Sequence, residues 1–160
     1  MKFSSLFEIL PEKTAYAHCD IPCGIYDPNN AQMSAHTVIR MTQFLQEIKR
    51  DDETKAEHDI SRVTHVKEEH ASLLEKELFT LRHDYFKDEQ MKEYSNLQDL
   101  FYSALKSNQK ARTGIDMESA KETLETVMQI AEIFYKSKGL ESHRVKAPYP
   151  TGLDIVVQKS

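Results

Sequence analysis

The sequence contains few of the residues that interrupt regular structure and few of those that cross-link extracellular scaffolds. Its 160 residues include four glycines, five prolines, two cysteines and no tryptophan. So few glycines and prolines favour a mostly helical chain, and two cysteines make a poor disulfide framework, which suits a reducing compartment. We therefore expect one mainly helical domain in the cytoplasm.

Long apolar runs and clusters of basic residues are also missing. No stretch approaches the roughly 18 consecutive apolar residues that a membrane-spanning helix needs. The formal net charge is −5, and no group of lysines and arginines marks a face that could follow a phosphate backbone. The sequence therefore predicts neither a membrane protein nor a nucleic-acid binder.

The first seventeen residues carry only part of the pattern of a secretory signal. Ala15-Tyr16-Ala17 has the form of an A-x-A cleavage site, but Glu8 interrupts the apolar stretch and Pro11 follows soon after it. We interpret residues 1–17 as a leader that a processing protease removes inside the cell.

Apolar residues recur at helical spacing in four later segments. Short connections between helices of this length favour an all-α fold, an up-down antiparallel four-helix bundle. The segments run from after Pro28 to near Arg50, from Asp51-Asp52 onward through Leu81, from about Asp88 to Ser107, and from the cap residue Asp116 to a stop near Gly139.

Histidines in this pattern exclude two common helical metal sites. A di-iron bundle needs Glu-x-x-His pairs, and none of the seven histidines has a glutamate three positions before it. His65 and His70 are five positions apart, which is not the spacing of a zinc protease. His70 lies on an apolar stripe, and its role as a core residue or as a neighbour of a metal site stays open. We expect solvated side chains at His36, His58, His65, His83 and His143.

The two cysteines lie within five positions of each other, beside a histidine, in the stretch HCDIPC at residues 18–23. Pro22 and Gly24 flank Cys23, so the loop can turn tightly and bring both sulfurs to one point. Two cysteines cannot complete a structural zinc site, which takes four ligands. A metal bound here therefore needs further donors.

Removal of the leader would supply those donors. Cleavage after Ala17 would give His18 a free α-amine, which can chelate a metal together with the backbone nitrogen and thiolate of Cys19. The thiolate of Cys23 completes a plane of two nitrogens and two sulfurs, with the His18 imidazole over one face. Such a plane suits Ni(II) or Cu(II), and an axial imidazole suits a more oxidised state.

Residues 18–28, HCDIPCGIYDP, resemble the N-terminal nickel hook of the nickel-dependent superoxide dismutases almost position for position. A second patch, DYFK at residues 84–87, is similar to the segment between the second and third helices of that family. The resemblance spans about residues 18–139. We accordingly divide the chain into a leader (1–17), a nickel-binding hook (18–30), a four-helix bundle (31–139) and an irregular C-terminal extension (140–160), in which Ile155-Val156-Val157 could add a short strand.

The resemblance implies a homohexamer with one nickel ion per subunit. In the implied ping-pong reaction, Ni(III) oxidises one superoxide to O₂ and Ni(II) reduces a second one to H₂O₂. The implied metal ligands are His18, Cys19 and Cys23, the implied supports of the hook are Asp20 and Pro22, and the implied lining of the approach to the metal is Tyr26 and Tyr85.

Three further positions matter for this interpretation. Lys87 is a candidate cation that attracts superoxide, with a solvated lysine as the alternative. Better-known members hold the axial imidazole with a glutamate of the first helix and an arginine of the second, and the corresponding positions here are Ser34 and His70. Because such partners usually orient a ligating histidine, we expect the axial ligand to be tuned differently in this chain.

Two other functions are compatible with the hook. A nickel or copper carrier would bind metal through the same residues without turnover. A thiol switch would use a disulfide between Cys19 and Cys23, and it would need neither His18 nor cleavage of the leader. The dismutase interpretation requires both the histidine and the new N-terminus.

Overall fold

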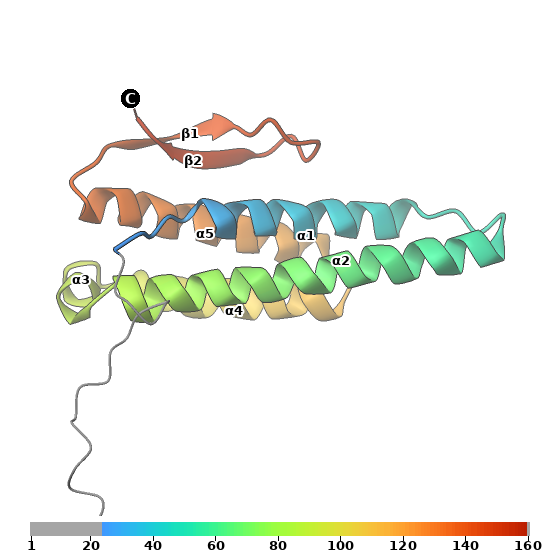
Figure 1. The fold of residues 1–160 in the computed structure, drawn as a ribbon, viewed down its shortest axis with the longest axis horizontal. Coiled ribbons are helices and arrows are strands. Elements are labelled where there is room, and N and C mark those ends of the chain that lie inside the picture. The colour runs from blue at the N-terminus through green and yellow to red at the C-terminus, as the bar shows by residue number, and fades with distance from the viewer. Residues whose placement is uncertain (1–23, 160) are drawn as a thin grey trace, which may run out of the picture.

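The structure is a computed structural model that describes residues 24–159. This part of the chain is mostly helical, with a small two-stranded sheet at its C-terminal end (Figure 1). The predicted leader and the predicted site residues His18, Cys19, Asp20, Pro22 and Cys23 lie outside the described residues. The elements are α1 (Asn29–Glu47), α2 (Glu53–Thr80), a π-helical turn η1 (Leu81–Tyr85), α3 (Asp88–Glu93), α4 (Leu97–Thr113), α5 (Met117–Ser137), β1 (Ser142–Lys146) and β2 (Asp154–Gln158).

Four long helices lie side by side and enclose the core (Figure 1). Helix α1 packs against α2 and α5, and α4 packs against the same two helices. The stripe predicted for the last segment is buried along its whole length. Its members are Ala120, Leu124, Val127, Ala131 and Phe134, each at most 2% exposed. None of the helices between residues 24 and 159 combines the length and apolar character that crossing a bilayer requires.

Two aspartates start the helices at the places that the sequence predicts. The carboxylate of Asp52 accepts from the backbone N–H of Lys55 at 3.0 Å, at the start of α2. The carboxylate of Asp116 accepts from the backbone N–H of Ser119 at 3.0 Å and from its hydroxyl at 2.7 Å, at the start of α5. Each bond satisfies an N–H group that has no partner within the helix, so the predicted cap at Asp116 is confirmed.

The third predicted helix is wrong as one continuous segment. The chain forms the short helix α3, turns at residues 94–96, and starts α4 at Leu97, where the backbone N–H of Leu97 donates to the carbonyl of Tyr94 at 2.9 Å. Ser95 and Asn96 account for the break, because their short polar side chains compete with the helical backbone for hydrogen bonds. Helix α4 then continues past the predicted end at Ser107, because Ala111 in its last turn is fully buried.

The prediction of an irregular C-terminal extension is also wrong. Residues 142–146 and 154–158 form an antiparallel hairpin in which Val145 pairs with Ile155. The short strand foreseen at Ile155-Val156-Val157 is confirmed, and Ile155 and Val156 are 8% and 1% exposed. The hairpin contacts α5, and Arg144 ties it there by ion pairs to Glu125 and Glu132 at 2.8 and 2.7 Å.

Candidate metal centre

The described chain begins directly after the last predicted ligand, Cys23. Gly24 has φ of +69°, a left-handed backbone conformation that residues other than glycine rarely adopt, so the backbone turns immediately after Cys23. Three residues later in the same segment, Asp27 accepts from the backbone N–H of Asn29 at 2.7 Å and so fixes the entry to α1. Burial and the nearby charge of Asp27 raise the pKa of Tyr135 on α5, so this segment lies against the end of α5.

The structure brings together Tyr26 and Tyr85, which the sequence separates by almost sixty positions. Their ring centroids are 5.5 Å apart, at an interplanar angle of 53°. The Tyr85 ring also contacts Phe86 of the DYFK patch at 4.8 Å and Phe134 of α5 at 4.7 Å. Such tilted aromatic contacts fix the position of each ring. The two tyrosines therefore form one wall beside the segment that leads out of the hook.

The hydroxyl of Tyr85 has a defined direction of donation. Its oxygen lies 2.7 Å from the hydroxyl oxygen of Ser137, and the Ser137 hydroxyl donates to the backbone carbonyl of Phe134 at 2.7 Å. Ser137 has one hydroxyl proton, and a carbonyl only accepts, so Tyr85 must be the donor in the first bond. The Tyr85 oxygen keeps its capacity to accept a hydrogen bond, as it would from an ordered water.

Two lysines could supply a cation near this wall. Lys87 is exposed at the start of α3, where its backbone N–H donates to the side-chain oxygen of Gln90 at 3.0 Å. Lys138 was not foreseen as a site residue, yet its ammonium nitrogen lies 5.5 Å from the centre of the Tyr85 ring and 4.9 Å from that of Phe134. The sequence marks Lys138 only as a basic residue at a helix end, so no motif could have indicated this contact.

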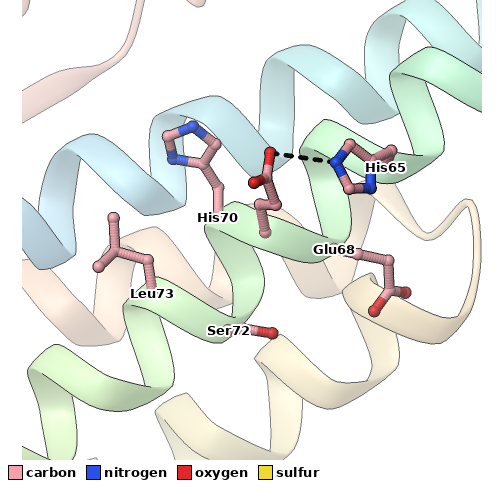
Figure 2. A pocket seen from close by; sticks show the side chains of 6 residues that line it. His65, Glu68, His70, Ser72 and Leu73 are labelled. Carbon is pink, nitrogen blue, oxygen red and sulfur yellow. Dashed lines mark ion pairs between the residues drawn. The ribbon is translucent and has the colours of Figure 1, made fainter.

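Ser34 and His70 border one cavity of about 300 Å³ between α1 and α2. Ser34 is 1% exposed, and His70 is half-buried with its Nδ1 atom buried and without a hydrogen-bond partner in the described part of the chain. Figure 2 shows a second, neighbouring pocket on α2, where His70 and Leu73 project from the helix and His65 pairs with Glu69 at 3.6 Å. The ring of His70 is thus partly enclosed, and its role beside a metal site stays a prediction.

The expectation that His36 is solvated is wrong. His36 is only 3% exposed and lies between α1 and the C-terminal hairpin, where it contacts Thr151 and Asp154. Burial lowers its pKa, which the carbonyl and charge of Asp154 only partly oppose. The sequence contains no sign of this burial, because the hairpin that covers His36 was not foreseen. His58, His65, His83 and His143 are exposed or nearly so, as expected.

Between residues 24 and 159, no group of three or more histidine, cysteine, aspartate or glutamate side chains is arranged to hold a metal ion. The donors predicted from the sequence are those of His18, Cys19 and Cys23, which would offer two thiolates and, after cleavage of the leader, amine, amide and imidazole nitrogens. This mixture of sulfur and nitrogen donors suits nickel or copper and not magnesium or calcium. The predicted donor set fits nickel, and in the sequence it ends three positions before Tyr26.

The family model of the nickel-containing superoxide dismutases matches residues 13–138. The chain belongs to that family. It is 33% identical over 128 residues to the nickel superoxide dismutase of Streptomyces coelicolor and 32% identical to that of Streptomyces seoulensis, in each case over 80% of this chain and 93% of the relative. The native structure of nickel superoxide dismutase at 1.30 Å superposes with a TM-score of 0.68 at 31% identity, and a structure with the nickel ligation of the oxidised state superposes with 0.69 at 32%.

These matches decide the nature of the cofactor and the class of reaction. A nickel superoxide dismutase is an oxidoreductase that acts on superoxide, so nickel is the cofactor, and the hypothesis of a metal carrier without turnover is not favoured. Each superposition covers 99% of the solved chain and 76% of this chain. The C-terminal hairpin lies beyond the matched residues, so it is an addition to the part of the fold that the nickel superoxide dismutases share.

Proposed function

We propose that this chain dismutates superoxide at one nickel ion held by His18, Cys19 and Cys23 after removal of residues 1–17. The observation that carries the proposal is the HCDIPC stretch at residues 18–23, placed at the start of the segment that matches the family. Bound nickel supplies a one-electron couple between Ni(III) and Ni(II), which takes an electron from one superoxide and returns one to the next. Asp20 and Pro22 shape the hook around it.

The described residues contribute the surroundings of the reaction. The paired rings of Tyr26 and Tyr85 would line the approach to the metal, and the Tyr85 oxygen is free to accept a hydrogen bond from a water there. Lys87 and Lys138 attract the anionic substrate by their charge. The reaction consumes two protons for each H₂O₂ formed, and because the Tyr85 hydroxyl donates to Ser137, water would supply these protons.

Ser34 and His70 are proposed to hold the His18 imidazole in this chain. The support is the buried Nδ1 of His70, which has no partner among residues 24–159, in a cavity that Ser34 also lines. A neutral histidine carries one proton and one free lone pair on its ring, so it can donate to or accept from a second imidazole. A ligand histidine held in this way would keep one tautomer.

The remaining parts of the proposal concern organisation. The four long helices, joined by short connections, form an up-down antiparallel bundle over residues 31–139, preceded by the hook at residues 18–30 and followed by the extension at residues 140–160. The subunits assemble as a homohexamer with one nickel each. A protease of the cytoplasm releases the leader, and the enzyme works in that compartment.

The test uses the chain that starts at His18, loaded with nickel, together with the variants Cys19→Ser, Cys23→Ser and His18→Ala. We expect the unaltered chain to accelerate superoxide decay toward the diffusional range of about 10⁸–10⁹ M⁻¹ s⁻¹, and both serine variants to lose nickel and activity together. Tight nickel binding with superoxide decay no faster than in buffer would favour the carrier. A redox response that survives His18→Ala and does not need nickel would favour the thiol switch.

A further inference from the structure

The C-terminal hairpin packs on the helix that directly follows the hook. We propose that this hairpin is a clasp that holds the first turns of α1, and through them the nickel hook, and that Gln32 and His36 are the positioning residues that fasten it. The inference rests on the proposed function of residues 18–23. It concerns a segment outside the family match, which ends at residue 138.

Gln32 connects α1 to β2 by two buried hydrogen bonds. Its side-chain nitrogen donates to the carbonyl of Val156 at 3.0 Å, and the backbone N–H of Val156 donates to its side-chain oxygen at 2.7 Å. Gln32 is fully buried and Val156 is 1% exposed, so water cannot replace either bond. The side-chain amide of Gln32 therefore supplies Val156 with the donor and the acceptor that a neighbouring strand would supply.

His36 makes the second connection, one turn further along α1. Its Nε2 lies 3.2 Å from the carbonyl oxygen of Asp154, and its Nδ1 lies 2.7 Å from the hydroxyl oxygen of Thr151. A carbonyl only accepts, so the proton of the neutral ring is on Nε2, and Nδ1 accepts from the Thr151 hydroxyl. The ring of Tyr149 meets His36 edge-on, with centroids 4.9 Å apart.

The two contacts are spaced almost equally along α1 and along β2. Residues four apart on a helix are separated by about 6 Å along its axis. Residues two apart on a strand are separated by about 6.6–6.8 Å. Gln32 and His36 therefore reach the backbone groups of Val156 and the backbone carbonyl of Asp154 on the edge of β2 that does not pair with β1. An edge that would otherwise be open for pairing with another chain is closed by α1.

The clasped turns of α1 are continuous with the hook. The backbone N–H of Gln32 donates to the carbonyl of Pro28 at 3.2 Å, and Asp27 holds the N–H of Asn29, so the order of the first turn extends back to the segment that contains Tyr26. On its other side, the hairpin loop supplies Tyr149–Thr151 as one wall of the cavity that Ser34 and His70 line. Detaching the hairpin from α1 would thus disturb both the start of that helix and the cavity proposed to hold the His18 imidazole.

The experiment compares two ways of loosening the hairpin in the nickel-loaded chain that starts at His18. Gln32→Leu and His36→Leu cut the connection to α1, whereas Arg144→Ala cuts the connection to α5 and serves as the matched control. The readouts are the nickel affinity, measured by competition with a chelator, and the electron paramagnetic resonance spectrum of the oxidised nickel, which reports the axial nitrogen.

We expect each leucine variant to weaken nickel binding by about tenfold or more and to change the spectrum, as loss of an orienting partner usually does, while Arg144→Ala stays within about twofold. His36→Gln retains a donor and an acceptor and is expected to restore most of the affinity. If Gln32→Leu does not fold, the pair His36→Leu and His36→Gln decides the same question.

Three results would overturn the clasp. Folded leucine variants with unchanged nickel affinity and spectrum would contradict it directly. An equal loss in Arg144→Ala and in the α1 variants would reduce the effect to general destabilisation. A His36→Gln variant as impaired as His36→Leu would show that the hydrogen bonds of His36 are not what matters. Failure of the unaltered chain to bind nickel would contradict the proposed function instead.

Discussion

Replacing Tyr85 with phenylalanine tests the direction of the hydrogen bond that the structure assigns to this residue. The change removes the hydroxyl that donates to Ser137 at 2.7 Å and leaves the ring in place. The ring contacts with Tyr26, Phe86 and Phe134 do not involve the oxygen, so they persist. The variant therefore isolates the contribution of one half-buried hydroxyl.

The expected cost in stability is that of one hydrogen bond. A bond of this kind contributes about 0.5–1.5 kcal/mol to the free energy of unfolding. In a chain of this length about 1 kcal/mol corresponds to a melting temperature lower by about 2–4 °C. Ser137 keeps its own bond to the carbonyl of Phe134, so no further loss is expected.

The expected loss of activity distinguishes two roles of the Tyr85 hydroxyl, ordering a water and transferring a proton. If the Tyr85 oxygen only orders a water, the rate constant for superoxide dismutation falls by less than about tenfold. A hydroxyl that transferred its proton to the substrate would cost about 10²–10⁴-fold when removed. We predict the smaller loss, because the Tyr85 proton is directed at Ser137 and away from the reacting space.

The assay is the decay of superoxide generated by pulse radiolysis, with nickel-loaded chains that start at His18 and carry Tyr85→Phe, Ser137→Ala or both. Tyr102→Phe on α4 is the matched control, since the side chain of Tyr102 is 65% exposed and its ring lies against Lys106. A hundredfold or larger loss in Tyr85→Phe, at unchanged nickel content, would refute the assigned direction of donation.

Three other changes have expected outcomes. Lys67→Met should lower the free energy of unfolding by about 2–3 kcal/mol, because the buried Lys67 ammonium donates to the carbonyls of Ala111 and Gly114. A urea titration measures this loss, with Lys121→Met at an exposed position as the control. Equal unfolding midpoints for the two variants would contradict the prediction. Burial lowers the pKa of His36 from 6.5, so on acidification the unfolded chain binds a proton before the folded chain does. The melting temperature should therefore fall below about pH 6.5, and it should fall less in His36→Gln. Identical pH profiles for the two proteins would show that His36 does not contribute. Removal of nickel by a chelator should leave the far-ultraviolet circular dichroism unchanged, because the core of residues 24–159 is apolar and needs no metal; unfolding on chelation would contradict this.

Helical periodicity predicted where three of the long helices, α1, α2 and α5, lie. The stripe from Ala120 to Phe134 repeats every three or four residues, and it is buried because only one face of α5 points inward. Asp52 and Asp116 are recognisable as caps from the sequence because capping depends on local residues alone. The break at residues 94–96 was missed because the apolar spacing continues across it, although Ser95 and Asn96 carry the local signal.

The hairpin and its contacts depend on residues far apart in the sequence. Val156 is more than a hundred positions from Gln32, and no periodicity connects a strand of five residues with the helix that closes its edge. The burial of His36 follows from the same packing, so a histidine that looks polar by its neighbours in the sequence is in fact enclosed. The contact of Lys138 with the Tyr85 ring is likewise tertiary.

The hook is the reverse case, because its chemistry is local. His18, Cys19 and Cys23 lie within six consecutive positions, so their donors can be recognised from the sequence without a fold. The residues proposed to surround the metal come from distant parts of the sequence. The structure was needed to place Tyr26 beside Tyr85 and to show that the buried Nδ1 of His70 has no partner among residues 24–159. The family match then joins both parts in one enzyme.

The most direct test of the account compares the superoxide dismutation rate of the chain that starts at His18 with that of the full-length chain under identical nickel loading. In the full-length chain the nitrogen of His18 is in a peptide bond with Ala17 and cannot serve as an amine ligand. The account predicts fast dismutation by the trimmed chain and a rate near that of buffer for the uncut chain. Equal rates for the two would contradict it.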